Sequence, residues 1–404
     1  MGQIGLDCDV IICGAGPVGL TAALKLAQHG VSSIILEKRD SLNLASKAST
    51  FHPPTLEILD EFGLLDVMLA QGCKADHIGY FRIDGEVIAV FDQPVSLGAD
   101  THIPYRIHLE QSAITPHLLK KAVESGFARI NYLMDVQEVG QDASGVWAQV
   151  GNGQKYRAKY ILGADGAQSA VRSSLQIEQQ GHKYPGRVLR LMVDHSIKTF
   201  MPALAPVSYI YSETHSSISL LEMPDCWRII IRVPEGVPDE EVKTPEWFMP
   251  ILQKFLPKCA SQLNILGTDV YGASKMIVNS NRVGRIGLIG DAVHLTNTKG
   301  GMNMNCGFHD AYAVASSIVY EMKSDAGNTD LFAAALQERL RVATDVLLPR
   351  TDKNVSGKQD WLDLIADAAA DPFKARNYLL TSSMIDMAPA LQARRCEETE
   401  CDTK

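Results

Sequence analysis

The sequence predicts an α/β fold in which a parallel-sheet frame is interrupted by an antiparallel β-sheet and followed by C-terminal helices. Three observations predict it. The chain opens with a strand, a glycine-rich loop, a helix and a second strand over residues 9–37. Two later apolar runs, 160–163 and 286–289, each lead to an aspartate beside a glycine and then to a helical pattern. Between them, residues 187–233 alternate β-type and polar residues, as antiparallel strands do.

The opening unit is the clearest local pattern. Its strands, 9–14 and 33–37, are continuous apolar runs, which is typical of strands buried in a parallel sheet. The intervening segment, 17–30, has helical spacing and ends on Gly30, a residue suited to the position just after a helix. The sequence therefore predicts a βαβ unit at the N-terminal end of the frame.

The remaining elements follow from the same periodicities. We expect helices over these ranges: 53–70, which begins with proline, 112–125, 245–256, about 303–322, 329–346 and 359–369. We expect a hairpin over 78–92 turning at Asp84-Gly85, strands over 129–150 turning at Ser144-Gly145, and strands over 187–195, 207–213, 216–222 and 226–233. The last fifteen or so residues are polar and charged, and we expect them to be frayed.

Composition excludes several classes of protein. A chain of 404 residues with a net charge of −9 has core enough for two to three domains and lacks the basic face of a nucleic-acid-binding protein. We find no apolar run long enough to span a membrane and no signal peptide. The eight cysteines show no metal-like grouping with histidine. We therefore expect a cytoplasmic enzyme with reduced thiols, with no metal site, no nucleic-acid partner and no membrane span.

The glycine-rich loop, GAGPVG, carries a dinucleotide-binding pattern. Gly14 permits a tight turn, Gly16 lets backbone N–H groups approach a diphosphate, and Gly19 lets the helix pack closely on the strand. Glu37 ends the second strand, where a carboxylate accepts hydrogen bonds from ribose hydroxyls. An acid there suits FAD or NAD and repels a 2′-phosphate. The alternative, a structural glycine turn, explains the loop without explaining Glu37.

Two later junctions repeat the arrangement. GADGAQSAVR places Asp165 between glycines before a short helix, and a simple Asp-Gly turn that caps this helix explains it equally well. GDAVH places Asp291 after the strand at 286–289, and GGMNMNCGFHDA follows. NAD alone does not require three such junctions. They suit an extended dinucleotide whose phosphates, ribityl chain and ring are each held separately.

These three motifs, in this order, resemble those of the FAD-dependent aromatic hydroxylases of the para-hydroxybenzoate hydroxylase family, and particularly its polyprenyl-methoxyphenol hydroxylase-like group. The resemblance covers roughly residues 8–350. It implies a Rossmann-like FAD-binding domain with an inserted antiparallel substrate domain. The expected segments are 1–75, 105–180 and 280–358 for the FAD-binding domain, 76–104 and 181–279 for the substrate domain, and 359–404 for a C-terminal helix and flexible tail.

The resemblance also implies the residues that hold FAD. They are Gly14, Gly16, Pro17, Val18, Gly19, Glu37 and Lys38 around the ADP half, Lys47 near the diphosphate and the entering NAD(P)H, Gln111 beside the ribityl chain, Asp165, and Gly290, Asp291, Gly301, Met304 and Asn305 around the flavin. Asp291 would bond ribityl hydroxyls. The helix that begins near Asn303 would point its free N–H groups at the flavin edge that becomes anionic on reduction.

The implied activity is a single-component monooxygenase. NADPH or NADH reduces FAD, dioxygen adds, and the flavin hydroperoxide hydroxylates a small phenolic or heteroaromatic substrate. Two alternatives stay open: an FAD-dependent dehydrogenase or reductase that inserts no oxygen, and a flavin-binding protein that has lost turnover. The resemblance identifies neither the ring that is modified nor the preferred nicotinamide, and the chain is expected to be a monomer or a homodimer.

Residues for the reaction itself are less defined, and we assign none as catalytic. Asn297 and Thr298 line the expected reaction site, where relatives usually carry prolines, and this departure from the family puts the hydroxylation geometry in doubt. Alternation along the inserted strands places Tyr209 and Tyr211 on one face, and Arg228 opposite Trp227. The first two and Arg228 are substrate-pocket candidates, although ordinary sheet packing or a solvated surface explains each of them as well.

Overall fold

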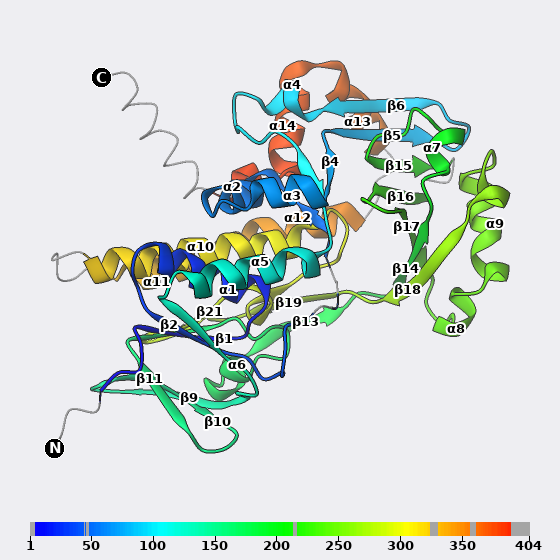
Figure 1. Cartoon of the computed structure of the whole chain (residues 1–404). Helices are drawn as coiled ribbons and strands as arrows, with labels where there is room; N and C mark the ends of the chain where they lie inside the picture. Colours follow the sequence, from blue (N-terminus) through cyan, green and yellow to red (C-terminus); the bar gives the residue numbers. More distant parts are fainter. Residues whose placement is uncertain are drawn as a thin grey trace, which may run out of the picture.

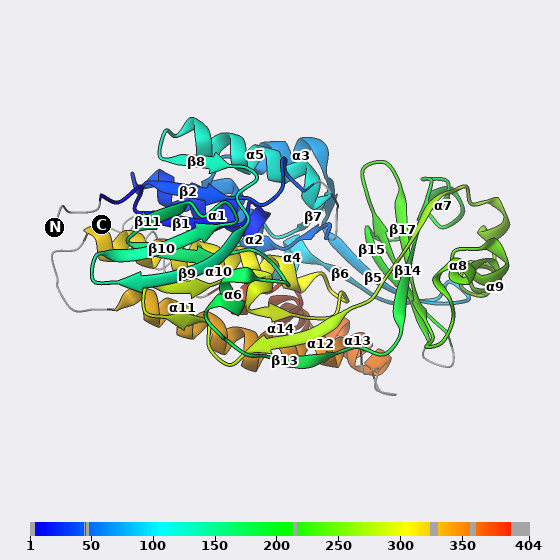
Figure 2. The ribbon, with the colours of Figure 1, turned by 90° about the horizontal axis from the view of Figure 1, so that it is seen from below.

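The computed structural model describes residues 5–43, 45, 48–212, 216–323, 330–355 and 361–388. It confirms the predicted α/β fold. A mostly parallel sheet lies at one end of an elongated molecule and a larger, mostly antiparallel sheet at the other (Figures 1 and 2). The expected frayed tail, 390–404, and Lys47 lie outside the described residues. In the described part of the chain, no helix combines the length and apolar character needed to cross a membrane.

The parallel sheet brings the three predicted junctions together. Its strand order is β20–β21–β12–β1–β2–β8. The strands are β1 (Val10–Cys13), β2 (Ser33–Leu36), β8 (Ala128–Asn131), β12 (Tyr160–Gly163), β21 (Ile286–Leu288) and β20 (Arg282–Val283), of which only the last is antiparallel. Cys13 pairs with Gly163, and Gly163 pairs with Leu288. The carboxyl ends of these strands are therefore level, and the loops that follow them lie at one edge of the sheet.

Both faces of this sheet are covered, which explains its continuous apolar strands. Ile12 faces a core shared with Leu20 and Phe308, whereas its neighbour Ile11 faces a core shared with Val146. The first core lies beneath α1 (Pro17–Gln28), α5 (Gln111–Glu124) and α10 (Met302–Lys323). The second lies beneath a small sheet of β9 (Val136–Asp142), β10 (Gly145–Val150) and β11 (Lys155–Ala158).

The second sheet has seven strands in the order β18–β14–β17–β16–β15–β5–β6. They are β5 (His77–Arg82), β6 (Val87–Asp92), β14 (Arg187–Val193), β15 (Val207–Tyr211), β16 (Ser217–Glu222), β17 (Trp227–Val233) and β18 (Ile265–Tyr271). Trp227 is buried with Phe248 and Leu252 of α9 (Pro245–Phe255), so one face packs on that helix. Near β5 and β6, the sheet packs on α13 (Trp361–Ala370) and α14 (Pro372–Ser382).

Two three-stranded sheets lie between these bodies. One consists of β3 (Thr50–Phe51), β7 (Arg106–His108) and β4 (Cys73–Ala75), with β7 in the centre. The other consists of β13 (Gln179–Lys183), β19 (Ser274–Val278) and β22 (His294–Leu295). The strands of this second sheet lead from the parallel sheet toward the seven-stranded sheet (Figure 2). Because both small sheets bridge the two bodies, residues on them are well placed to contribute to a site between them.

Three details differ from the sequence prediction. The helix expected at 53–70 is two helices, α2 (Pro53–Glu61) and α3 (Leu65–Gln71), because Gly63 between them adopts a positive φ of 63°. The helix α14 was not predicted; Pro372 begins it and Asp371 caps it by accepting from the Lys374 amide. The helix α11 (Leu331–Val342) does not end near 346, but continues through a π-helical turn (Ala343–Leu347) into α12 (Leu348–Val355).

Candidate active site

A cavity of about 1390 Å³ runs from the glycine-rich loop to the seven-stranded sheet. Its wall includes Gly14 and Glu37 at one end, Asp291 in the middle and Tyr209 at the other end. Residues from the parallel sheet, from both bridging sheets and from the seven-stranded sheet thus enclose one continuous space. A space of this length accommodates an extended dinucleotide with a second molecule beyond it.

The glycine-rich loop is built for an anion. A Cβ on Gly14, where φ is +104°, would lie 2.5 Å from the Ala164 carbonyl oxygen, and one on Gly19 would lie 2.2 Å from the Gly14 oxygen. Gly16 faces the cavity, and nothing lies within 4 Å of the position its Cβ would take. The first turn of α1 has no acidic residue and no side-chain cap, so its N–H groups and positive dipole end stay available to a diphosphate.

The Glu37 carboxylate shapes this loop as well as lining the cavity. One oxygen accepts a hydrogen bond from the Ala15 amide at 2.9 Å, and the other accepts from the Arg39 amide at 3.0 Å. The side chain is buried, and Pro17, Val18 and Lys38 line the same end of the cavity. The carboxylate therefore holds the loop and the strand end together. Its expected contact with a ribose stays a prediction.

The sequence left two roles open for Asp165, ligand binding and capping of the following helix, and the structure is compatible with both. One carboxylate oxygen accepts from the Val171 amide at 3.1 Å and so caps α6 (Ala170–Ser174). The other oxygen is buried and has no hydrogen-bond partner among the described residues. Asp165 and Gln111 both line the cavity. An unpaired buried carboxylate oxygen beside the cavity fits a ligand that donates hydrogen bonds.

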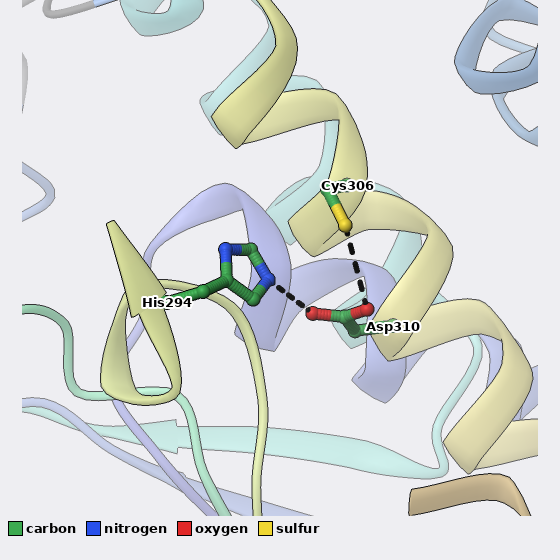
Figure 3. A group of neighbouring side chains, drawn as sticks. All are labelled: His294, Cys306 and Asp310. Carbon is green, nitrogen blue, oxygen red and sulfur yellow. Dashed lines mark hydrogen bonds and ion pairs between the residues drawn. The ribbon is translucent and has the colours of Figure 1, made fainter. Parts of the chain in front are cut away.

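A chain of side-chain hydrogen bonds supports the late loop. Asp291 lines the cavity and accepts from Asn303 Nδ2 at 2.8 Å. The Asn303 side-chain Oδ1 lies 3.0 Å from His294 Nδ1. His294 Nε2 lies 2.8 Å from the Asp310 carboxylate (Figure 3). Asn303 thus connects the cavity-lining acid to a buried histidine-aspartate pair.

Behind the loop lies a buried network of charges. Asp310 accepts from Arg339 Nε at 2.7 Å, and Arg339 also donates to Cys306 Sγ at 3.2 Å. Burial alone raises the pKa of Asp310, but Arg339 and His294 outweigh it and hold this pKa below its ordinary value. Burial opposes a charge on His294, yet the Cys306 and Asp310 side chains raise its pKa well above the ordinary value. The network is therefore a set of paired ions.

This network also gathers three side chain types that bind metals, which the sequence spacing did not indicate. The ligand atoms of His294, Cys306 and Asp310 lie within 4.8 Å of one another (Figure 3). However, both Asp310 oxygens already accept from His294 and Arg339, and the guanidinium places a positive charge where a cation would bind. We assign the cluster to holding the loop and not to metal binding.

The structure places most of the expected FAD residues on the cavity wall. Those that line it are Gly14, Gly16, Pro17, Val18, Glu37, Lys38, Gln111, Asp165, Asp291, Gly301 and Met304. Gly19, Gly290 and Asn305 do not. Gly290 donates its amide to Asp310 at 3.2 Å, and the Asn305 side chain accepts from the His52 amide and donates to the Thr50 and Gly301 carbonyls. These contacts give Gly290 and Asn305 supporting positions behind the wall.

The loop at 297–299 is fixed without the prolines of its relatives. Asn297 donates through Nδ2 to the Thr351 carbonyl at 2.7 Å and accepts from the Lys299 amide at 3.1 Å. Asn297, Thr298 and Lys299 all line the cavity. Burial, and then the nearby Arg232, lowers the pKa of Lys299 to about 8. This chain therefore adds a cation to the loop that faces the expected reaction site.

At the sheet end, Tyr209, Tyr211 and Arg228 line the cavity, as does Arg232. Tyr209 stacks on Tyr80 with ring centroids 5.1 Å apart, and Arg228 forms an ion pair with Glu110. The sequence analysis did not single out Arg106 and His108 on β7, which also line the cavity and are buried. Alternation along a strand of only three residues gives no recognisable signal, so only the fold reveals them.

Comparison with known proteins agrees with this geometry. The profile of the FAD binding domain family matches residues 7–348. Para-nitrophenol 4-monooxygenase of a Pseudomonas species (strain WBC-3) is 27% identical over 363 residues, 87% of each chain. The 6-hydroxy-3-succinoylpyridine 3-monooxygenase of Pseudomonas putida is 25% identical over 385 residues, 92% of this chain and 96% of that protein.

Solved structures share the fold. The crystal structure of p-nitrophenol 4-monooxygenase from Pseudomonas putida DLL-E4 superposes with a TM-score of 0.82 at 24% identity, covering 93% of this chain and 98% of that one. A ternary complex of aklavinone-11 hydroxylase with FAD and aklavinone superposes with a TM-score of 0.70, covering 87% and 68%. The resemblance to FAD-dependent aromatic hydroxylases, drawn from three short motifs, is thereby confirmed.

Proposed function

The chain belongs to the FAD binding domain family, and on that premise we propose that it is a monooxygenase that uses NAD(P)H and dioxygen to hydroxylate a small phenolic or heteroaromatic ring. One observation carries the proposal. The same cavity that holds the dinucleotide features, from Gly14 to Asp291, continues into a pocket bounded by tyrosines and arginines of the seven-stranded sheet. Similar proteins are named as monooxygenases of nitrophenol and of a hydroxypyridine, which supports an aromatic substrate.

The residues present fit FAD. Gly16 leaves open space at the cavity wall, the α1 N-terminus is free of acids, and Asp165 presents an unpaired oxygen. We propose that Gly16 and the α1 N-terminus hold the diphosphate, that Asp165 accepts a hydrogen bond from a hydroxyl of the cofactor, and that Glu37 holds the ribose. We propose that Gln111, Asp291 and the start of α10 hold the ribityl chain and ring. Bound FAD supplies the redox chemistry, namely hydride acceptance from NAD(P)H and activation of dioxygen.

The chain contributes position and electrostatics. Tyr209, Tyr211 and Arg228 bound the space beyond the flavin end of the cavity, and we propose that they hold the substrate ring there. Asn297 fixes the loop that faces this space through its bond to the Thr351 carbonyl. Lys299 and Arg232 add positive charge to the same wall, which favours a bound ring that carries an anionic substituent away from its hydroxyl or amino group.

The test is substrate-stimulated turnover of the FAD-loaded protein. Across a panel of phenols and pyridinols, at least one compound should accelerate NAD(P)H oxidation, consume oxygen, and yield a product heavier by one oxygen atom. NAD(P)H oxidation and substrate conversion without that product would instead support the dehydrogenase or reductase alternative. Protein that binds FAD but is not reduced with any compound would support a flavin-binding protein without turnover.

Further features stay predictions. We propose that the co-substrate is NADPH or NADH, that the chain is a monomer or a homodimer, and that its location is cytoplasmic. The six cysteines in the described part of the chain are all unpaired, which fits a reducing compartment. Size-exclusion chromatography with light scattering measures the oligomeric state, and steady-state rates with each nicotinamide measure the preference.

A further inference from the structure

The strand β7 presents two buried polar side chains to the cavity. Arg106 is 4% exposed and His108 is fully buried, and both line the cavity wall. They are two residues apart on a strand, so their side chains lie on the same face. Neither belongs to the motifs that hold the dinucleotide. Buried polar groups normally have hydrogen-bond partners, so those that lack one need an explanation.

The contacts of His108 define its tautomer. Nδ1 lies 2.8 Å from the Glu222 carbonyl oxygen, at the end of β16. A carbonyl oxygen only accepts, so Nδ1 carries the hydrogen and donates it. Burial, opposed by the Glu222 bond and aided by Arg106 and Arg228, lowers the pKa of His108 to about 4. The ring is therefore neutral near pH 7, and Nε2 carries a lone pair.

This lone pair is unused. His108 Nε2 is buried and has no hydrogen-bond partner in the described part of the chain. A buried acceptor without a partner is unfavourable, and a ligand removes that penalty by donating a hydrogen bond to it. A ligand that offers only acceptors at that point recovers nothing, since two lone pairs repel.

The groups around His108 are mostly donors. Arg106 Nη2 donates to the Ser382 carbonyl at 3.0 Å, while its Nε has no partner among the described residues. Arg228 pairs with Glu110, and its Nε also lacks a partner there. His108 Nε2 is thus an acceptor flanked by two positive side chains. A hydroxyl oxygen bound there donates its proton to Nε2 while its lone pairs face positive charge.

We propose that His108 Nε2 accepts a hydrogen bond from the hydroxyl or N–H group of the substrate ring, so that this cavity selects aromatic rings bearing a neutral donor. The inference rests on the proposed function for the identity of the ligand as an aromatic ring. The donor keeps its proton in the bound state.

The test measures ligand binding to the FAD-loaded protein by equilibrium dialysis. The probes are 4-nitrophenol, at a mildly acidic pH where it is protonated, and its methyl ether 4-nitroanisole, which has no donor. Wild-type protein should bind the phenol about tenfold or more tightly than the ether, the ratio that one such hydrogen bond of about 1.4 kcal/mol produces. A second pair, 4-nitroaniline and its N,N-dimethyl derivative, should show the same preference.

The variant His108→Asn keeps a side-chain N–H in the place of Nδ1 for the Glu222 carbonyl and removes the acceptor. The phenol preference should fall to within about twofold. The control is His309→Gln, which replaces another buried histidine, outside the cavity, and retains a group for its contact with Thr55 at 3.2 Å. It should leave the preference unchanged.

Several results would overturn the inference. They are an unchanged preference in His108→Asn, an equal loss in His309→Gln, or wild-type protein that prefers the donor in neither probe pair. If His108→Asn does not fold, the two probe pairs with wild-type protein still show whether the cavity prefers ligands that have a donor. Oxygen insertion is assayed separately. Wild-type protein that hydroxylates a substrate but shows no preference for ligands with a donor would contradict only this inference. Donor preference without hydroxylation defeats only the proposed reaction.

Discussion

The two glycine-rich loops at the edge of the parallel sheet are held in different ways. In the first, 14–19, close backbone contacts are the main constraint, because Gly19 lies so close to the Gly14 carbonyl that no side chain fits, and the Glu37 carboxylate adds one hydrogen bond from the Ala15 amide. In the second, 290–301, buried charged and polar side chains provide the support, from Asp291 through Asn303 and His294 to Asp310. The first loop therefore depends on steric fit over a few residues, and the second depends on electrostatics between distant residues.

This difference explains why the second loop can vary. A loop held by close backbone contacts tolerates almost no change at its glycines. A loop held from behind by ion pairs can change the residues that face the cavity, such as Thr298 and Lys299, provided that the network remains. Asn297 and Thr298, which stand where the resemblance implies prolines, lie in the second loop.

The largest expected effect comes from removing the centre of the network. Asp310→Asn leaves Arg339 and His294 buried without their carboxylate, and unfolding free energy should fall by about 3–5 kcal/mol. Urea denaturation measures it. The control Glu338→Gln removes the partner of Arg341 in an exposed ion pair and should cost less than about 1 kcal/mol. Equal losses of unfolding free energy in both variants would show that the buried network stabilises the protein no more than the exposed ion pair does.

The next effect tests the first loop. Gly19→Ala places a Cβ against the Gly14 carbonyl, so the loop must move, and stability should fall by about 1–3 kcal/mol. FAD retention, measured by flavin fluorescence after desalting, should also fall. Gly151→Ala is the control, because its Cβ would meet nothing closer than 4.0 Å. Full FAD retention in Gly19→Ala would contradict the steric account of this loop.

A smaller effect separates the two roles within the second loop. Asp291→Ala should weaken FAD binding about tenfold or more, because it removes a carboxylate that lines the cavity and is expected to bond ribityl hydroxyls. Asn297→Ala removes a bond to the Thr351 carbonyl behind the loop and should change FAD affinity far less. Titration of the FAD-free proteins with FAD measures both. Equal affinities would argue against the role assigned to Asp291.

The smallest expected effect concerns Lys299, whose pKa burial lowers to about 8. Below that pH the ammonium is protonated and attracts an anion; as pH rises through about 8 the charge is lost. Binding of benzoate, whose carboxylate stays ionised throughout, should therefore weaken roughly twofold to fivefold over this range. Lys299→Met should bind benzoate with a flat pH dependence. A step of the same size in the variant would assign the titration to another group.

Sequence reasoning predicted what short segments encode. GAGPVG, GADG and GD identified the three strand-to-helix junctions, since each depends on residues adjacent in the chain. Alternation placed Trp227 and Arg228 on opposite faces of β17, and in the structure Trp227 lies in the core while Arg228 lines the cavity. The predicted helix boundaries were wrong where a single residue ends a helix, as Gly63 does between α2 and α3.

Contacts between distant residues could not be predicted. Asp310 meets Arg339 29 residues later, and His108 meets Glu222 114 residues later. Nothing in the vicinity of either residue marks it as part of a site. From the sequence alone, an aspartate on a helix, such as Asp310, is expected to face solvent. A strand of three residues, such as the one that holds His108, is too short to show the alternation that would predict which way its side chains face. Their roles follow only once the two sheets and the bridging strands are placed.

The π-helical turn at Ala343–Leu347 has a consequence for protein engineering. On its N-terminal side Arg339 donates to Asp310 of α10, and on its C-terminal side the Thr351 carbonyl accepts from Asn297 of the late loop. One continuous helix therefore contacts both the buried network and the loop. Deleting one residue there would restore an ordinary α-helix and rotate the later half by about 100° relative to the earlier half. The extra residue therefore sets the rotation of the later half of the helix relative to the earlier half. A one-residue deletion would separate the Arg339–Asp310 contact from the Asn297–Thr351 contact without changing either the Arg339 or the Asn297 side chain.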